Sequence, residues 1–324
     1  MKIGFIGCGK MAAKMAESIK DLEGCEFDCC AARDLSRAND FKKAYGFKKA
    51  YGNYDDLLND KEVELIYIST VTKTHYELIK LCLKHNKNVL CEKPFCVNSI
   101  ESKEVIELAK KQNVYLAEAI WTRYMPVRES VKELIAGGLI GKPYLYIASI
   151  GYAIDTKERM QDPIGGGVLL DCGVYPINFV LMNSNEKVTN IDANAILTPS
   201  GVDETDIIWL NLTNNVRAVI YCTMKSNIDC IGYIYGDNGF IKFDHVNHPT
   251  KVEVYNNERP PKVIKTLTFK HKCGGYEYQW LEAIKQIELN KKESISMPLS
   301  ETQKVMEILD EIRSKAGIKF NNEK

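Results

Sequence analysis

Three side chains in two separate stretches of the sequence could carry out acid–base chemistry: Lys93, Asp171 and Tyr175. Lys93 follows a predicted strand over Asn88–Cys91 and directly precedes Pro94, whose ring restricts the backbone. An ammonium held there can hydrogen-bond a substrate hydroxyl or lower the pKa of a neighbouring phenol. The alternative is a surface lysine paired with Glu92, and the sequence favours neither interpretation.

Asp171 and Tyr175 belong to Gly165-Gly-Gly-Val-Leu-Leu-Asp-Cys-Gly-Val-Tyr175. A helix predicted from the three glycines to Met182 places the two side chains at i and i+4, on one face. A phenol becomes a useful base at neutral pH only beside a cation, and Tyr175 could then exchange a proton with an alcohol while Asp171 orients the substrate. Alternatively, Asp171 caps the helix and Tyr175 packs. The triple glycine favours close approach of a ligand.

A glycine-rich turn near the N-terminus could bind the phosphates of a dinucleotide. Gly7, Gly9 and Ala12 occupy the small positions of G-x-G-x-x-[G/A], between a predicted strand at Ile3–Ile6 and a helix over Met11–Leu22. Backbone amides at the start of that helix, from Lys10, Met11 and Ala12, would face the phosphates. The alternative is an ordinary tight turn between a strand and a helix.

The end of the second predicted strand, Phe27–Ala32, bears on the choice of cofactor. NAD-binding relatives of this motif place an acid about 20 residues after the glycines, where it holds the ribose hydroxyls. Here Arg33 and Arg37 could bind a 2′-phosphate instead, which favours NADP, with NAD still possible. Alternatively, Arg37 is solvated on the next helix and Asp34 serves the ribose.

Other candidate cofactor contacts follow later strands of the first half. Thr70 and His75 come after a strand predicted over Glu64–Thr70, and Glu92 precedes Lys93. Trp121 and Arg123 could line a pocket at the domain junction. A buried, hydrogen-bonded histidine and a structural salt-bridge arginine are the alternatives for His75 and Arg123.

The order of predicted elements indicates an α/β protein with two domains. Strands and helices alternate up to residue 118, which predicts a doubly wound parallel sheet in a nucleotide-binding Rossmann domain over residues 1–120. From 121 to 324, consecutive strands with short turns predict a large, mostly antiparallel open sheet in a substrate-binding and dimerisation domain. Helices would cover one face of that sheet, and a second copy of the chain could cover the other.

Composition excludes several classes of function. Lysine plus arginine equals aspartate plus glutamate, at 43 each, so we expect no nucleic-acid or membrane partner. The sequence shows neither an 18-residue apolar run nor a signal peptide, and we expect a cytoplasmic protein. The 11 cysteines are scattered without a C-x-x-C pair, which predicts reduced thiols and no metal site. The tail after Lys319 is a candidate for disorder.

Together these motifs resemble the Gfo/Idh/MocA oxidoreductase family over nearly the whole chain. The similar stretches are Gly4–Gly9 with Ala12, Glu92–Pro94 and Gly165–Tyr175. The segments 31–37 and 118–123 further resemble the branch of dihydrodiol dehydrogenases and NADP-linked xylose dehydrogenases. The resemblance implies a Rossmann domain, a dimerising open sheet, NADP, Lys93 and Tyr175 as the catalytic pair, and Asp171 in the substrate site. Inositol dehydrogenase relatives carry histidine at position 175, which disfavours cyclitol oxidation.

We therefore expect an NADP-dependent oxidoreductase that transfers a hydride between nicotinamide and a sugar, polyol or trans-dihydrodiol. One alternative is a non-catalytic NADP(H)-binding sensor or regulator on the same fold. Another is a carbohydrate lyase or hydrolase that uses bound NAD transiently, although Arg33 and Arg37 argue against it.

Overall fold

The structure, a computed structural model, describes residues 1–320 and divides into two compact units. The first unit contains Met1–Tyr124 and Lys272–Met306, and the second contains Met125–His271 and the residues from Glu307 on. We expected one boundary at residue 120. The chain does leave the first unit near that point, but it returns for a further segment close to its C-terminus. The tail that we predicted to be disordered lies, apart from Phe320, outside the described residues.

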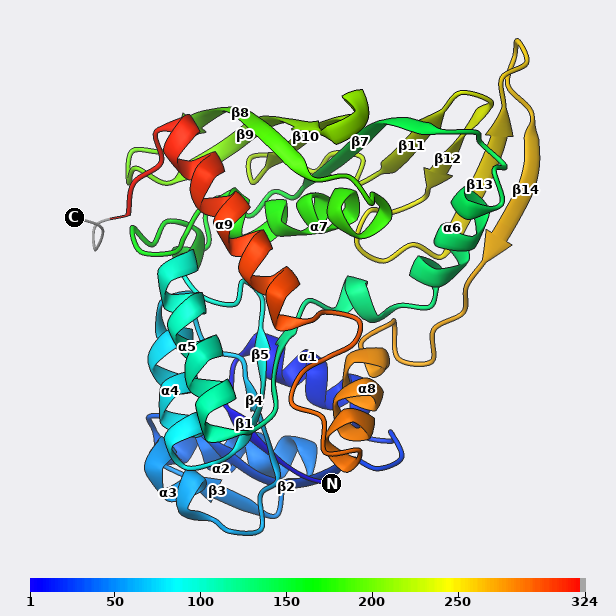
Figure 1. The fold of residues 1–324 in the computed structure, drawn as a ribbon. Coiled ribbons are helices and arrows are strands. Elements are labelled where there is room, and N and C mark those ends of the chain that lie inside the picture. The colour runs from blue at the N-terminus through cyan, green and yellow to red at the C-terminus, as the bar shows by residue number, and fades with distance from the viewer. Residues whose placement is uncertain (321–324) are drawn as a thin grey trace. The chain divides into compact units, whose positions relative to one another are not determined.

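The first unit holds a six-stranded parallel sheet, as predicted (Figure 1). Its strands are β1 (Lys2–Ile6), β2 (Glu26–Ala31), β3 (Lys49–Tyr51), β4 (Leu65–Ile68), β5 (Asn88–Glu92) and β6 (Leu116–Ala119). They are arranged in the order β3-β2-β1-β4-β5-β6. The order reverses between β1 and β4, and this is the position at which ligands bind beyond the strand ends of such sheets.

Five helices of this unit alternate with its strands: α1 (Lys10–Ile19), α2 (Leu35–Tyr45), α3 (Tyr54–Asn59), α4 (His75–Lys84) and α5 (Ser99–Gln112). The unit also contains α8 (Glu277–Glu288) and the beginning of α9 (Leu299–Ala316), which come later in the chain. The three-residue strand β3 was not predicted. Its side chains are only half-buried, so it lacks the continuous apolar run of a central parallel strand.

Helix α8 explains why a C-terminal segment belongs to the first unit. Its Trp280 is fully buried and stacks on Phe5 of β1, with ring centroids 5.9 Å apart. The indole N–H of Trp280 also donates a hydrogen bond to the sulfur of Met15 in α1, at 2.9 Å. Burying an aromatic side chain of this size is worth several kcal/mol, about 1.5–3 for a smaller apolar residue. The core of the first unit is therefore completed by a residue from the end of the chain.

The second unit holds an eight-stranded sheet that is antiparallel except where β10 runs parallel to β7. The strands are β7 (Pro143–Gly151), β8 (Val188–Leu197), β9 (Asp203–Leu212), β10 (Arg217–Thr223), β11 (Gly232–Gly236), β12 (Gly239–Phe243), β13 (Lys251–Asn256) and β14 (Val263–Thr268). Helix α7 (Val174–Asn183) packs on β7 and β10, and α6 (Val127–Ala136) packs on α7 (Figure 1). The prediction of a large, mostly antiparallel sheet is confirmed.

The face of this sheet opposite α7 remains apolar and exposed. In β9, Ile208 and Leu210 are fully buried, whereas the alternating residues Ile207 and Trp209 are 49% and 52% exposed. Tyr221 of the neighbouring strand β10 is also exposed on this sheet. Since successive strand residues point to opposite faces, the exposed set forms a second apolar face.

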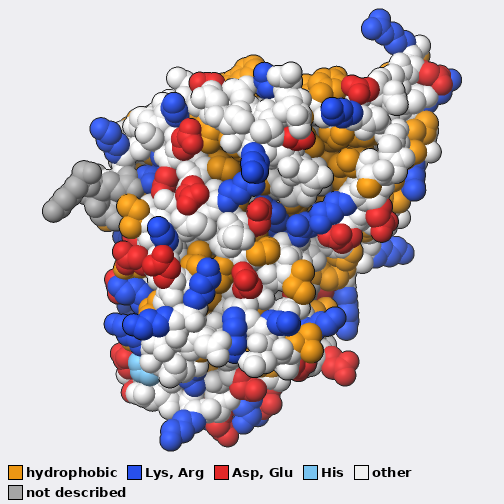
Figure 2. Space-filling model, viewed as in Figure 1, with side chains coloured by type: hydrophobic (Ala, Val, Ile, Leu, Met, Phe, Trp, Pro, Cys, Tyr) orange, Lys and Arg blue, Asp and Glu red, His pale blue; other side chains and the backbone are white. Residues whose placement is uncertain are grey.

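One face of the molecule agrees with the balanced composition. Basic and acidic side chains are interspersed over the face of the molecule shown in Figure 2. Among residues 1–320, no helix combines the length and the apolar character needed to cross a membrane.

Candidate active site

The first glycine turn, Gly7–Gly9, joins β1 to α1 and leaves the start of the helix open. Gly7 has φ +100°, and a Cβ there would lie 3.0 Å from Thr70 Cγ2 and 3.1 Å from the Ser69 carbonyl oxygen. Gly9 is the residue before α1 and has no side chain, so it does not cap the amides at the start of the helix. Open amides and the helix dipole together suit an anion. The turn therefore has the geometry that a dinucleotide phosphate needs.

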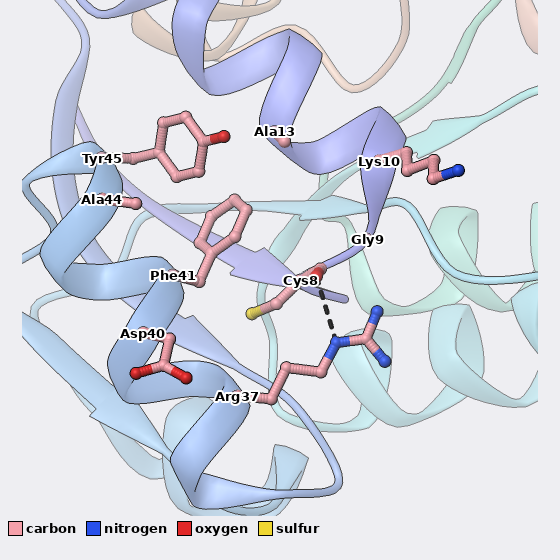
Figure 3. Close-up of a pocket in the computed structure, with 9 residues that line it drawn as sticks. All are labelled: Cys8, Gly9, Lys10, Ala13, Arg37, Asp40, Phe41, Ala44 and Tyr45. Atoms are coloured by element: carbon pink, nitrogen blue, oxygen red, sulfur yellow. Dashed lines mark hydrogen bonds between the residues drawn. The ribbon is translucent and has the colours of Figure 1, made fainter.

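The residues after Gly9 divide between core and surface. Ala12 is fully buried, which is consistent with close packing of α1, whereas Met11 is half-buried and Lys10 is exposed. Lys10 lines an open pocket of about 390 Å³ between α1 and α2 (Figure 3). The remaining lining residues are Cys8, Gly9, Ala13, Arg37, Asp40, Phe41, Ala44 and Tyr45.

Arg37 connects α2 to the first glycine turn. Its Nε donates a hydrogen bond to the carbonyl oxygen of Cys8 at 3.2 Å (Figure 3). Arg33 is exposed in the segment between β2 and α2. Asp34, the residue that could serve a ribose, caps α2 and accepts a hydrogen bond from the Ser36 amide at 2.8 Å. The basic residue, and not the acid, therefore lies against the turn.

His75 is a buried structural residue, which was the alternative interpretation of this side chain. Its Nδ1 lies 3.0 Å from the Pro94 carbonyl oxygen and its Nε2 lies 3.2 Å from that of Thr70. Burial lowers the pKa of His75 and so favours the neutral imidazole, which has one N–H to donate. Both ring nitrogens face the backbone, so His75 links the segment after β4 to the segment after β5.

Lys93 directly follows β5 and is next to Glu92, a buried acid. The Tyr67 hydroxyl donates a hydrogen bond to Glu92 Oε1 at 2.6 Å, and burial raises the pKa of Glu92 to about 7. The positive charge of Lys93 opposes this rise. Lys93 itself is half-buried, and the peptide bond to Pro94 is cis. The carboxyl ends of β1, β4 and β5 thus carry the glycine turn, Thr70 and Lys93 respectively.

Trp121 and Arg123 are held by contacts within the first unit. Trp121 stacks on Tyr276 with ring centroids 4.4 Å apart, and it is only 6% exposed. Arg123 is buried, and its Nη2 lies 3.6 Å from Glu301 Oε2. The structure thus shows the salt-bridge role that was the alternative for Arg123.

In the second unit, Asp171 lies within a π-helical turn, Leu169–Gly173, and Tyr175 lies in α7, which continues from that turn. The predicted regular helix from Gly165 is therefore wrong in its first part. A π-helical turn has i→i+5 hydrogen bonds, so the i, i+4 spacing alone does not fix which way the two side chains point. Such turns are frequent at functional sites.

Arg159 is the functional candidate that the sequence reasoning missed. Two nitrogens of its guanidinium donate hydrogen bonds to the two carboxylate oxygens of Asp171, with Nη2 to Oδ2 at 3.0 Å. Burial lowers the pKa of Arg159, but the hydrogen-bonded Asp171 outweighs this and raises it, and Tyr175 is among the nearby groups that raise it further. Tyr175 is 9% exposed. No motif marks Arg159, because it lies 12 residues before Asp171 in a separate short 3-10 turn, Glu158–Met160.

The second glycine turn, Gly165–Gly167, approaches the chain itself and not the open space that a ligand would need. A Cβ on Gly166 would lie 2.4 Å from the Asp162 carbonyl oxygen, and one on Gly167 would lie 2.0 Å from Asp203 Oδ1. We expected the close approach of a ligand to these glycines, whereas the atoms that approach Gly166 and Gly167 belong to Asp162 and Asp203.

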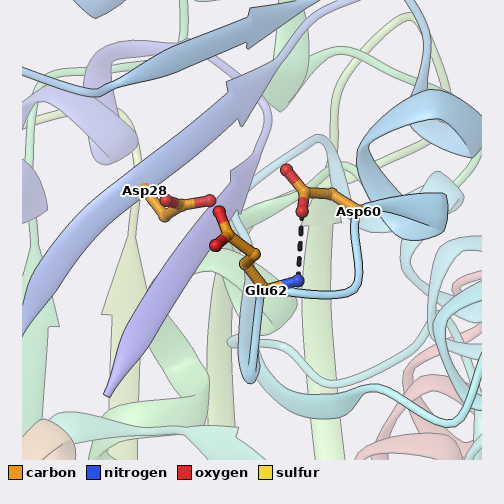
Figure 4. Close-up of side chains that lie close together, drawn as sticks. All are labelled: Asp28, Asp60 and Glu62. Carbon is orange, nitrogen blue, oxygen red and sulfur yellow. Dashed lines mark hydrogen bonds between the residues drawn. The ribbon is translucent and has the colours of Figure 1, made fainter.

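Three acids in the first unit lie close together, as the ligands of a cation would, but they surround a lysine. Asp28, Asp60 and Glu62 bring their carboxylates together (Figure 4). The Lys49 ammonium lies 2.7 Å from Asp60, 2.8 Å from Glu62 and 3.4 Å from Asp28. The cluster is therefore an ion-pair network around a lysine.

Comparisons with known proteins agree with the fold described above. A family model described as "Oxidoreductase family, NAD-binding Rossmann fold" matches residues 1–119, and a model of the GFO/IDH/MocA C-terminal domain matches residues 129–242. The chain is 33% identical over 333 residues to the trans-1,2-dihydrobenzene-1,2-diol dehydrogenase of Mus musculus, covering 100% of this chain and 99% of that protein. The protein of the same name from Homo sapiens is 30% identical over 332 residues, with coverage of 100% and 99%.

Solved structures support the fold at lower sequence identity. The 3-ketoreductase KijD10 of Actinomadura kijaniata, in complex with NADP and TDP-benzene, has a TM-score of 0.86 at 19% identity, covering 97% of each chain. Levoglucosan dehydrogenase in complex with NADH and L-sorbose has a TM-score of 0.87 at 17% identity, covering 98% of this chain and 97% of that chain. The chain therefore belongs to the Gfo/Idh/MocA family of oxidoreductases.

Proposed function

We propose that this oxidoreductase uses NADP to interconvert an alcohol and a carbonyl group on a sugar, a polyol or a trans-dihydrodiol. The observation that carries the proposal is the first glycine turn, which has an uncapped helix N-terminus and Arg37 hydrogen-bonded to its backbone. Arginine suits the oxygens of a 2′-phosphate, and Asp34 is engaged as a helix cap. The names of the relatives, which include dihydrodiol and levoglucosan dehydrogenases, support the substrate class.

The chain's own residues would divide the work as follows. The bound nicotinamide supplies the acceptor or donor of hydride. Tyr175 takes the hydroxyl proton when the alcohol is oxidised and returns it when the carbonyl is reduced. The positive charge of Arg159 is near Tyr175 and would stabilise its phenolate form, which accepts the proton during oxidation and remains after the proton is donated during reduction. Lys93 hydrogen-bonds the reacting oxygen, and Asp171, fixed by Arg159, orients the substrate.

Turnover tests this proposal directly. Thermal shifts would first compare NAD with NADP, and the preferred cofactor would then be used with aldoses and a trans-dihydrodiol. We expect Tyr175→Phe to lose roughly 100-fold in kcat, within the range for a general acid–base group. Tyr146→Phe is the matched control, since Tyr146 is a buried tyrosine of the same unit whose hydroxyl donates to the Asn183 carbonyl. Unchanged turnover by Tyr175→Phe would contradict the role of Tyr175, and NADP binding without any turnover would favour a sensor.

We also propose that the exposed face of the eight-stranded sheet binds a second copy of the chain. Trp209 and Ile207 would otherwise leave large apolar side chains in water. Light scattering should show a dimer, and Trp209→Lys should shift it toward the monomer. A monomeric wild-type protein at micromolar concentration would contradict this assembly.

A further inference from the structure

The second glycine turn is held by a buried carboxylate from a distant strand. Asp203 is the first residue of β9 and is 1% exposed. Its Oδ2 accepts a hydrogen bond from the Leu169 amide at 2.6 Å, and the Val168 amide also donates to this carboxylate. Both amides stand at the start of the π-helical turn. Asp203 therefore supplies the negative charge that the amides of a helix start attract.

The glycine at position 167 leaves the room that this carboxylate occupies. Gly167 has φ +90°, and a Cβ there would lie only 2.0 Å from Asp203 Oδ1 and 2.6 Å from Asp203 Cγ. No side chain fits at this distance unless the carboxylate moves. The turn can therefore keep this conformation beside Asp203 only because residue 167 is a glycine.

A second buried acid supports Asp203 from the same strand. Asp206 is fully buried, and its Oδ2 accepts from the Cys222 thiol at 3.5 Å. Among the described residues, no donor group reaches Asp206 Oδ1. Burial and the charge of Asp203 raise the pKa of Asp206. The two carboxyl groups lie close enough to share a side-chain hydrogen bond.

We propose that Asp203 is a positioning residue for the candidate active site, with the buried Asp206 beside it on the same strand. By fixing the amides of Val168 and Leu169, Asp203 sets where the π-helical turn begins. That turn contains Asp171, and Tyr175 lies in the first turn of the helix that continues from it. This inference rests on the proposed function for its catalytic consequence, but the structural role of Asp203 can be measured without it.

The test combines kinetics with hydrogen exchange on the full-length protein. We expect Asp203→Ala to lower kcat about 100-fold with a trans-dihydrodiol and NADP, while KM changes less than about threefold. Asp203→Asn keeps one acceptor oxygen and should lose only about tenfold in kcat, which is a partial rescue. Hydrogen exchange of the amides from Val168 to Tyr175 should be faster in Asp203→Ala, because both fixed amides lose their acceptor.

Asp244 provides the matched control. Its carboxylate accepts hydrogen bonds from the amide and the hydroxyl of Thr250, in a loop of the same unit. We expect Asp244→Ala to leave kcat and the exchange of the 168–175 amides unchanged. An equal loss in Asp244→Ala, or an Asp203→Ala protein with wild-type kcat and exchange, would overturn the inference. If the wild-type protein turns over no substrate, the proposed function fails, and the exchange comparison alone decides the role of Asp203.

Discussion

The two glycine-rich turns of this protein look alike in sequence but differ in what fills them. The first glycine turn leads into α1 without a side-chain cap and has Arg37 hydrogen-bonded to its backbone. The second leads into the π-helical turn and is filled by the carboxylate of Asp203. Both turns offer backbone amides to negative charge. In one the chain supplies that charge, and in the other it leaves the place for a ligand, so glycine content alone does not identify a binding site.

The largest expected effect of a single substitution is at the second turn. Gly167→Ala places a methyl group 2.0 Å from Asp203 Oδ1 at a φ of +90°. Combining steric clash with a strained backbone, we expect the free energy of unfolding to fall by roughly 4 kcal/mol. Urea denaturation measures this, and the loss should shrink when Asp203→Ala is combined with Gly167→Ala. Equal losses in both backgrounds would show that Asp203 does not limit the turn.

A buried acid of the first unit should make the stability of the protein depend on pH. Glu92, next to Lys93, accepts a hydrogen bond from Tyr67. Since burial raises the pKa of Glu92 from 4.5 to about 7, its contribution to stability is present below pH about 4.5 and is lost as pH rises through about 7. The unfolding free energy of the wild-type protein should therefore fall by about 3 kcal/mol between pH 5 and pH 8, and Glu92→Gln should not show this fall.

The control for Glu92 is a second tyrosine–glutamate pair in the same unit. Tyr76 donates to Glu104, but both groups lie near the surface, so Glu104→Gln should leave the pH dependence unchanged. If Glu92→Gln had the same pH profile as the wild type, burial of Glu92 would not be the cause.

At the first turn, the same glycine-to-alanine change should affect ligand binding and not folding. A Cβ on Gly9 would have its nearest neighbour at 3.9 Å, the Nη2 of Arg37, and φ at Gly9 is −96°. We expect Gly9→Ala to fold normally but to bind NADP about 30-fold more weakly, or roughly 2 kcal/mol, since the methyl group keeps the phosphates from the amides. Thermal unfolding and calorimetry separate the two effects. A stable variant with unweakened NADP binding would remove the distinction between the turns.

The smallest expected effect concerns cofactor preference. Arg37→Met should weaken NADP binding about tenfold and leave NAD binding unchanged, because only NADP carries the 2′-phosphate. Asp34→Ala should cost about 1 kcal/mol in unfolding free energy through the lost cap of α2, with no change in cofactor preference. A specific loss of NAD binding in Asp34→Ala would instead assign Asp34 to the ribose.

Local patterns predicted much of the fold and the first turn. The alternation of strands and helices predicted the parallel sheet, and the spacing of Gly7, Gly9 and Ala12 predicted the turn after its first strand, but the strand order was not predicted. The π-helical turn and the role of Asp203 could not be predicted, because Asp203 lies 34 residues from Leu169 and only the folded sheet brings them together. Likewise, the apolar face of α8 shows that Trp280 is buried, but not that it packs on Phe5.

The position of Trp280 has a consequence for how the protein is made. A ribosome delivers the six parallel strands within the first 119 residues, but the indole that completes their core comes much later. Phe5 and Met15 of the nascent first unit must therefore stay incompletely covered until α8 has been synthesised. Chains cut short before α8 should be substrates for chaperones and proteases, even though they contain every strand of that sheet.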